Sequence, residues 1–371
     1  MEASIRLGRI WGIPIGLHSS WFLVFGLVTW SLAAGYFPAE EPSLTATVYW
    51  VLAVVTSLLF FGSVLIHELG HSIIALRNQI PVHGITLFIF GGVAQIGREP
   101  RDAGAEFRVA IAGPLSSLGL AALFAGLWWF NRTTPYLAAP GIWLMRINLM
   151  LALFNLIPGF PLDGGRVLRA AVWHVTGSFQ RATKVATFAG QLTAFGFIGL
   201  GILTLLGGNV INGLWLVFIG WFLQNAAAAT YAQTNRQREL RDITVAQAMN
   251  RDCPAVPAQL ALQQLVDEHV LTGGQRCFFV VDEGHLRGLL TLADVTKVPK
   301  QDWNATAVSQ AMVPWEQLVL VQPDMSLLNA LQLIDDANVN QAPVVTDDQL
   351  VGMLSREQVL RYMRARTELG V

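Results

Sequence analysis

Two histidines four residues apart form the pattern in this chain that is best suited to chemistry. Residues 65–71 read Leu-Ile-His-Glu-Leu-Gly-His, which places Glu68 directly after His67 and three residues before His71. Residues four apart on a helix share a face, so both imidazoles can bind one ion. A bound zinc ion lowers the pKa of its water to about 7, and a neighbouring carboxylate can accept the proton. The pattern therefore predicts a hydrolytic zinc site.

A third ligand is expected, because zinc hydrolases usually supply three protein ligands and leave one position open. The best candidate is Asp163, in the segment 155–166, which reads Asn-Leu-Ile-Pro-Gly-Phe-Pro-Leu-Asp-Gly-Gly-Arg. Its two prolines and three glycines interrupt an apolar run. Irregular backbone at membrane depth is tolerated only where protein or water covers it. The break beside a carboxylate therefore indicates a buried active site; the alternative is a turn or cap carboxylate at the membrane interface.

Long apolar runs must position these motifs. The chain has 371 residues, 53% hydrophobic and 13% charged, whereas soluble domains carry about 25% charged residues. Runs of about 20 apolar residues can cross a hydrocarbon core of about 30 Å. We predict a polytopic helical membrane protein with six spans, because a soluble fold could not hide so many apolar helices from water. The spans are expected at roughly 14–36, 47–76, 105–130, 142–172, 184–206 and 210–231.

Basic residues are distributed unequally between the loops on the two sides of these spans. One side carries thirteen Lys and Arg residues, and the other carries Arg132 alone. The thirteen are Arg6, Arg9, Arg77, Arg98, Arg101, Arg108, Arg166, Arg169, Arg181, Lys184, Arg236, Arg238 and Arg241. Positive residues favour the cytoplasmic side, so we expect a multi-pass protein of a prokaryotic-type plasma membrane with both termini cytoplasmic. The net charge of −1 gives no indication of nucleic acid binding.

Between the second and third spans, residues 85–96 contain two β-prone apolar runs that flank Gly91 and Gly92. This pattern predicts a membrane-associated β-hairpin. The alternative is a plain re-entrant loop.

Residues 236–371 have a different character and contain an internal repeat. Residues 244–249 match 307–312, and residues 286–295 match 350–359. Each copy indicates helix, strand, tight turn, strand and helix. The expected strands are 277–282, 286–291, 343–346 and 350–355. We therefore divide the chain into a membrane domain, 1–235, and a soluble α/β domain, 236–371.

The two metal motifs together resemble those of the site-2 protease family of intramembrane zinc metalloproteases. The resemblance covers residues 1–235 and includes HExxH, the N-x-x-P-x-x-P-L-D-G segment that starts at residue 155, and Ala-Gly-Pro at 112–114. It implies regulated intramembrane proteolysis of single-span membrane proteins in the lipid bilayer. It also implies that the 85–96 hairpin offers a strand edge to the unwound substrate, which would replace the backbone hydrogen bonds that the substrate loses.

The resemblance assigns a role to each residue of the site. It implies Zn²⁺ held by His67, His71 and Asp163, with Glu68 as general base and proton shuttle. It also implies that Asn155 contacts the substrate backbone or the oxyanion. For Asn155 the alternative is a helix–helix hydrogen bond.

The repeat resembles a tandem pair of CBS domains, a pseudo-symmetric module that often binds adenine nucleotides. That family holds the ribose with a Thr or Ser followed three residues later by Asp. The first copy has Thr291 and Asp294, whereas the second has Ser355 with Gln358 in place of the Asp. The resemblance implies at most one nucleotide, ATP or AMP, that modulates the enzyme, and a homodimer formed through the module. A module that only dimerises or docks on the membrane domain is the alternative.

For the whole chain, the competing hypothesis is a CBS-gated transporter or channel. Transport needs polar groups distributed along a pathway, whereas here they converge on HExxH and Asp163 at one depth. The sequence therefore favours an enzyme.

The charge distribution gives a testable topology. A reporter enzyme that is active only in the cytoplasm should be active when it is fused after Val371. The basic loops favour the cytoplasmic side and so hold both termini in the cytoplasm. A reporter fused within the loop that holds Arg132 should give the opposite result. Activity of an extracytoplasmic reporter at Val371 would overturn this orientation.

Overall fold

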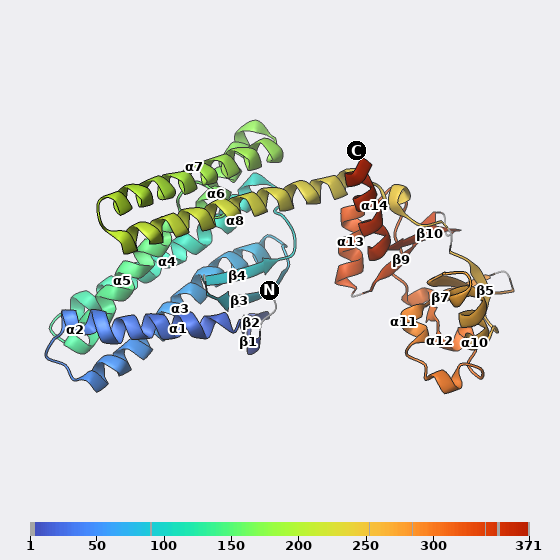
Figure 1. The fold of residues 1–371 in the computed structure, drawn as a ribbon, viewed down its shortest axis with the longest axis horizontal. Coiled ribbons are helices and arrows are strands. Elements are labelled where there is room, and N and C mark those ends of the chain that lie inside the picture. The colour runs from blue at the N-terminus through green and yellow to red at the C-terminus, as the bar shows by residue number, and fades with distance from the viewer. Residues whose placement is uncertain are drawn as a thin grey trace. The chain divides into compact units, whose positions relative to one another are not determined.

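The chain divides into two units, Met1–Ala232 and Gln233–Val371. Figure 1 shows the fold, taken from a computed structural model that describes residues 4–89, 91–251, 253–283, 285–337, 339–346 and 349–369.

Six helical stretches in the described part of the first unit are long and apolar enough to cross a membrane, which confirms the six expected spans. The first stretch, Ser20–Glu40, consists of α1 (Ser20–Ser31), a π-helical turn (Leu32–Tyr36) and α2 (Phe37–Glu40). The others are α3 (Ala46–Arg77), α4 (Ala103–Asn131), α5 (Pro135–Asn155), α7 (Phe179–Leu206) and α8 (Val210–Asp242), of which Val210–Ala232 is the apolar part.

The predicted bounds of the first and fourth spans are wrong, and the fourth begins at Pro135 rather than near residue 142. The first span begins at Ser20 rather than near residue 14, because Ile13–Leu17 forms a strand. The fourth ends at Asn155, and a separate helix, α6 (Asp163–Thr176), follows it. Pro158 and Pro161 lack the backbone N–H groups that helical hydrogen bonds need, and together with Gly159 between them they favour the break between these two helices.

A four-stranded sheet lies beside α3 in the membrane unit (Figure 1). Its strands are β1 (Ile5–Ile10), β2 (Ile13–Leu17), β3 (Val82–Phe88) and β4 (Gly91–Ile96), in that spatial order. The predicted hairpin is confirmed as the antiparallel pair β3–β4, with Phe88 opposite Gly91. Strand β2 runs parallel to β3, and the sequence did not predict this pairing. Strand β4 is at one edge of the sheet.

Small residues and polar pairs join the helices of the bundle, as expected where lipid gives no hydrophobic drive for helix association. A Cβ at Gly70 of α3 would lie 3.0 Å from the carbonyl oxygen of Ala112 in α4. Thr29 Oγ1 donates to Ser57 Oγ across α1 and α3, at 3.0 Å, and both residues are buried. The close contact between α3 and α4 therefore requires glycine at position 70, where any side chain would collide with α4.

The segment between α5 and α6 is held by the last two spans. Phe160 packs with Ala186 of α7 and Ala227 of α8, and Leu162 packs similarly on the same two helices. A Cβ at Gly190 of α7 would collide with the backbone of Phe160. Two spans thus fix the residues that directly precede Asp163.

The second unit contains the four predicted strands, which are confirmed, as β6 (Cys277–Asp282), β7 (His285–Thr291), β9 (Gln341–Thr346) and β10 (Gln349–Ser355). Two shorter strands, β5 (Ala255–Pro257) and β8 (Val313–Pro314), complete a four-stranded sheet in the order β5-β6-β7-β8, while β9 and β10 form their own pair. The helices are α9 (Val245–Ala248), α10 (Leu262–Leu265), α11 (Leu292–Val295), α12 (Val308–Ala311), α13 (Leu327–Asp336) and α14 (Arg356–Leu369). A disulfide joins Cys253 to Cys277, which the sequence did not predict.

The two repeats exchange their opening segments. Val245 and Ala248 are buried in the core of the second copy, and the backbone of Asn250 pairs with Met353 of β10. Conversely, Val308 is buried in the core of the first copy, and Val313 pairs with Leu289 of β7. The repeat in the sequence indicates two consecutive copies, but the structure shows two intertwined ones.

Candidate metal centre

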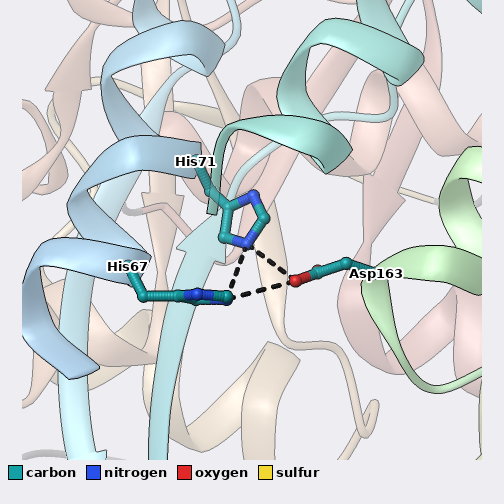
Figure 2. Close-up of side chains that lie close together, drawn as sticks. All are labelled: His67, His71 and Asp163. Carbon is teal, nitrogen blue, oxygen red and sulfur yellow. Dashed lines mark hydrogen bonds and ion pairs between the residues drawn. The ribbon is translucent and has the colours of Figure 1, made fainter. Parts of the chain in front are cut away.

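His67, His71 and Asp163 meet at one point inside the membrane unit (Figure 2). The two Nε2 atoms are 3.2 Å apart, and each lies 3.1 Å from Oδ2 of Asp163. Both imidazoles come from consecutive turns of α3, and the carboxylate comes from the first residue of α6. Each histidine is only 4% exposed. The structure thus brings together two motifs that are more than ninety residues apart in the chain.

The chemistry of these donors fits a metal ion. Nδ1 of His71 lies 2.7 Å from the carbonyl oxygen of Val109. A carbonyl only accepts, so Nδ1 carries the proton, and in a neutral imidazole Nε2 presents a lone pair. That lone pair points at a carboxylate oxygen, which also only accepts. A cation between them resolves this conflict, and two imidazole nitrogens with one carboxylate oxygen are a ligand set typical of hydrolytic zinc, with one position left open.

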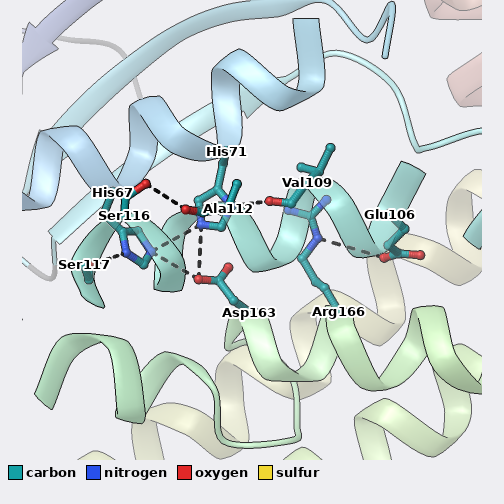
Figure 3. Close-up of polar contacts among 9 residues, drawn as sticks. All are labelled: His67, His71, Glu106, Val109, Ala112, Ser116, Ser117, Asp163 and Arg166. Atoms are coloured by element: carbon teal, nitrogen blue, oxygen red, sulfur yellow. Dashed lines mark hydrogen bonds and ion pairs between the residues drawn. The ribbon is translucent and has the colours of Figure 1, made fainter. Parts of the chain in front are cut away.

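Helix α4 contacts the Nδ1 atoms of both imidazoles, whose Nε2 atoms face Asp163, and so orients the two rings (Figure 3). The carbonyl of Val109 accepts a hydrogen bond from Nδ1–H of His71, and Oγ of Ser117 lies 2.9 Å from Nδ1 of His67. Such outer partners fix the ring orientation of metal-binding histidines. Sequence reasoning missed both contacts: a backbone carbonyl has no sequence signature, and nothing local distinguishes Ser117 from its neighbour Ser116.

Gly113 of α4 provides the space for the two imidazoles. A Cβ at this position would collide with the ring of His71 and would lie 2.7 Å from Nε2 of His67. Glycine followed by proline in a helix interior is unfavourable, by about 1 and about 3 kcal/mol relative to alanine. Two such unfavourable residues, Gly113 and Pro114, inside a 29-residue helix therefore indicate that another group packs closely against the helix at this point.

Glu68 lies between α3 and the edge strand β4. Its side chain contacts Gly92 so closely that a Cβ there would collide with it. Glu68 is half-buried and is not one of the three residues whose ligand atoms converge. Its position suits a group that handles protons beside the metal rather than one that binds it.

Asn155 is the last residue of α5 and is half-buried. Among the described residues, its side chain makes no hydrogen bond to His67, His71 or Asp163. The structure therefore does not join Asn155 to the three ligand residues.

In the second unit, Thr291 and Asp294 form a capping box at the start of α11. Thr291 Oγ1 donates to one carboxylate oxygen of Asp294 at 2.7 Å, and Lys297 Nζ donates to the other at 2.8 Å. In the second copy, the backbone amide of Gln358 donates to Ser355 Oγ at 3.1 Å. Both copies thus build the same turn, but only the first places a carboxylate there.

Comparison with known families agrees with the two-part organisation. The model of peptidase family M50 matches residues 55–139 and 133–197. The model of the CBS domain matches residues 240–300 and 308–365.

Similar proteins extend over nearly the whole chain. A Synechocystis sp. protein, whose name places it among the zinc metalloproteases, is 37% identical over 98% of this chain and 96% of its own length. A zinc metalloprotease of Methanocaldococcus jannaschii is 30% identical over 98% of this chain and 97% of its own. The solved structure of a site-2 protease from the same organism is 33% identical and covers 61% of this chain and 94% of its own, with a TM-score of 0.42.

The role of Gly113 can be tested without removing any ligand. Gly113→Ala should lower zinc affinity by at least about tenfold, because the new methyl group displaces the two imidazoles from their positions. Gly119→Ala is the matched control on the same helix, since a Cβ there meets open space. Zinc affinity is measured by chelator competition on the purified protein. Equal affinity in both variants would show that α4 does not constrain the imidazoles.

Proposed function

Because the chain belongs to peptidase family M50, the site-2 protease family, we propose that it cleaves membrane-spanning segments of other proteins inside the bilayer. The protein is a zinc metalloprotease and a multi-pass membrane protein. The observation that carries the proposal is the convergence of His67, His71 and Asp163 inside an apolar helical bundle. Ionisable groups in that setting are costly and usually mark function.

We assign the zinc ion to these three side chains. Bound zinc supplies Lewis acidity there, which activates water and polarises a carbonyl group at neutral pH. Glu68 takes the proton from the attacking water and returns it to the leaving amine, as general base and then general acid. Asn155, at the end of α5, contacts the substrate backbone or the developing oxyanion.

The substrate must become extended before it is cut, because a membrane-spanning helix hides its amides and carbonyls in its own hydrogen bonds. Within the described residues, no strand pairs with the outer edge of β4. Gly92 brings that strand against Glu68. We assign β4 as the strand on which the unwound substrate, a single-span protein, aligns beside the general base, since strand addition replaces the lost backbone hydrogen bonds.

Two variants separate the general base from the ligands. Glu68→Gln should keep the zinc but lower cleavage of a co-expressed single-span protein by about 10²–10⁴-fold, because a neutral amide cannot accept the proton. Asp163→Ala should lose zinc, because two histidines alone hold it poorly. Elemental analysis and a cleavage assay on both purified variants check this contrast. Wild-type cleavage by Glu68→Gln would remove Glu68 from the mechanism, and full zinc content in Asp163→Ala would remove that ligand.

For the CBS pair, we propose that ATP or AMP binds at Thr291 and Asp294 and changes the rate of cleavage. The carboxylate of Asp294 is already oriented by Thr291 and Lys297, and each of its oxygens has a further lone pair that can accept a hydrogen bond from a ribose hydroxyl. We also propose that two chains associate through this module.

We propose that helix α8 is the route for such control. Helix α8 is continuous from Val210 to Asp242. Leu223 and Ala227 on this helix pack against the segment that precedes Asp163, while Leu240 near its end packs on the core of the second CBS copy. A ligand can shift the enzyme only if it binds two arrangements with different affinity, and α8 is the element through which we expect such a difference to reach the site.

Nucleotide control predicts an asymmetric result for the two copies. Asp294→Ala should weaken ATP or AMP binding to the full chain roughly tenfold, because it removes a charged hydrogen-bond partner. Gln358→Ala is the matched control in the second copy and should have a smaller effect. Calorimetry measures the binding, and the cleavage assay with and without nucleotide measures the response. The absence of binding at millimolar nucleotide would leave the module as a dimerisation or docking element.

A further inference from the structure

Beyond the metal ligands, the membrane unit contains a buried ion pair between Glu106 of α4 and Arg169 of α6. Glu106 is 0% exposed and Arg169 is 6% exposed. Nε of Arg169 donates to Oε1 of Glu106 at 2.6 Å, and Nη2 donates to the same oxygen. Nε of Arg166, one turn earlier in α6, lies 4.0 Å from that oxygen (Figure 3). One carboxylate oxygen of Glu106 thus accepts two hydrogen bonds from Arg169 and also lies near Arg166, and both arginines belong to α6.

Arg169 also contacts two aromatic rings. Its guanidinium carbon lies 5.0 Å from the ring centre of Phe160 and 4.6 Å from that of Phe179. Phe160 belongs to the segment that precedes Asp163, and Phe179 begins α7. Cations over aromatic faces are attracted more strongly where water is excluded. Through these contacts the side chain of Arg169, a residue of α6, joins α4, α7 and the segment between α5 and α6.

The ion pair lies on the same two helices that build the metal centre. Glu106 is one turn before Val109, whose carbonyl orients His71. Arg169 is on the helix that starts at Asp163. A shift of α6 along α4 would therefore move the carboxylate ligand away from the two imidazoles.

This arrangement is costly, which argues that it has a role. Burying a carboxylate and a guanidinium removes both from water, and a pair of apolar residues would often serve stability equally well. The second oxygen of Glu106, Oε2, has no hydrogen-bond partner in the described part of the chain. A forked, planar guanidinium fixes direction as well as distance, which neither an apolar contact nor a lysine does.

We propose that Glu106 and Arg169 are positioning residues of the metal centre: their ion pair holds α6 on α4 so that Asp163 meets His67 and His71. This inference rests on the proposed ligand set. It concerns zinc affinity rather than the chemical step, because neither residue contacts the ligand atoms.

Zinc affinity of the full-length protein is the first measurement, by chelator competition in detergent micelles. Glu106→Gln and Arg169→Gln should each weaken zinc binding by about 10–100-fold, as the loss of outer-shell partners does. The double variant should be no weaker than the worse single one, because both changes remove the same interaction. Arg169→Lys keeps the charge but loses the fork and the stacking, so its affinity should lie between those of the wild type and Arg169→Gln.

Cleavage at saturating zinc is the second measurement. Added zinc should restore most of the activity of Glu106→Gln, because Glu68 is unchanged; activity that stays low at full zinc occupancy would contradict a pure positioning role. Thr29→Val is the matched control, since it removes another buried interhelical hydrogen bond that is remote from α4 and α6. It should lower the melting temperature without changing zinc affinity.

Three further results would overturn the inference. They are wild-type zinc affinity in Arg169→Lys and Arg169→Gln, additive losses in the double variant, and an equal loss in Thr29→Val. If Glu106→Gln does not fold, the milder Arg169→Lys decides by its affinity alone. Asp163→Ala is measured in parallel. If this variant keeps all of its zinc, the ligand set itself is refuted. If it loses zinc while the Arg169 variants bind zinc as tightly as the wild type, only the role of the ion pair is refuted.

Discussion

Two imidazoles and a carboxylate share one point inside an apolar helical bundle, and their burial constrains the elements around them. Each group loses its water, so each must find a partner in the protein or in a metal ion. His71 has its partner in the carbonyl of Val109 and His67 has one in Ser117. The remaining ring nitrogens and the oxygen of Asp163 face one another. A cation at that point satisfies all three at once, so the metal centre and the packing of the helices depend on each other.

Helix α4 meets this constraint by having little side-chain volume where it passes the site. Gly113 leaves the space that the imidazoles fill, and Gly70 of α3 allows the two helices to approach each other. Gly92 does the same for β4 against Glu68. Close backbone approach thus replaces bulky packing at three places around the same centre, which is how helices associate when the surroundings are as apolar as their side chains.

The break between α5 and α6 shows how a functional group can come from irregular backbone at membrane depth. Pro158 and Pro161 interrupt the helical hydrogen bonding. The backbone of this segment is covered by α7 and α8, as irregular backbone at membrane depth requires. Because α8 continues to Asp242, the element that covers the break is also the one that leads to the CBS pair. One helix thus covers the break and also connects the membrane unit to the CBS pair in the chain.

Features that depend on a local pattern could be predicted from the amino-acid sequence. HExxH follows from the four-residue repeat of a helix face, the spans from apolar runs of sufficient length, and the strands of the second unit from an internal repeat. Prolines and glycines beside a carboxylate are unusual in an apolar run, and this pattern predicts Asp163 as the third ligand; the structure places its carboxylate beside His67 and His71. The β3–β4 hairpin was predicted from its glycine pair and is present.

Features that depend on partners distant in the chain could not be predicted in this way and are seen only in the folded protein. Strands β1 and β2 join the membrane sheet through a parallel pairing of β2 with β3. The opening segments of the two repeats are exchanged, because a helix of four residues carries no local signal of which core will bury it. The carbonyl of Val109 and the pairing of Glu106 with Arg169 have no local pattern either. They arise only when α4 and α6 pack together, since the distance between two groups in space is not a property of either segment alone.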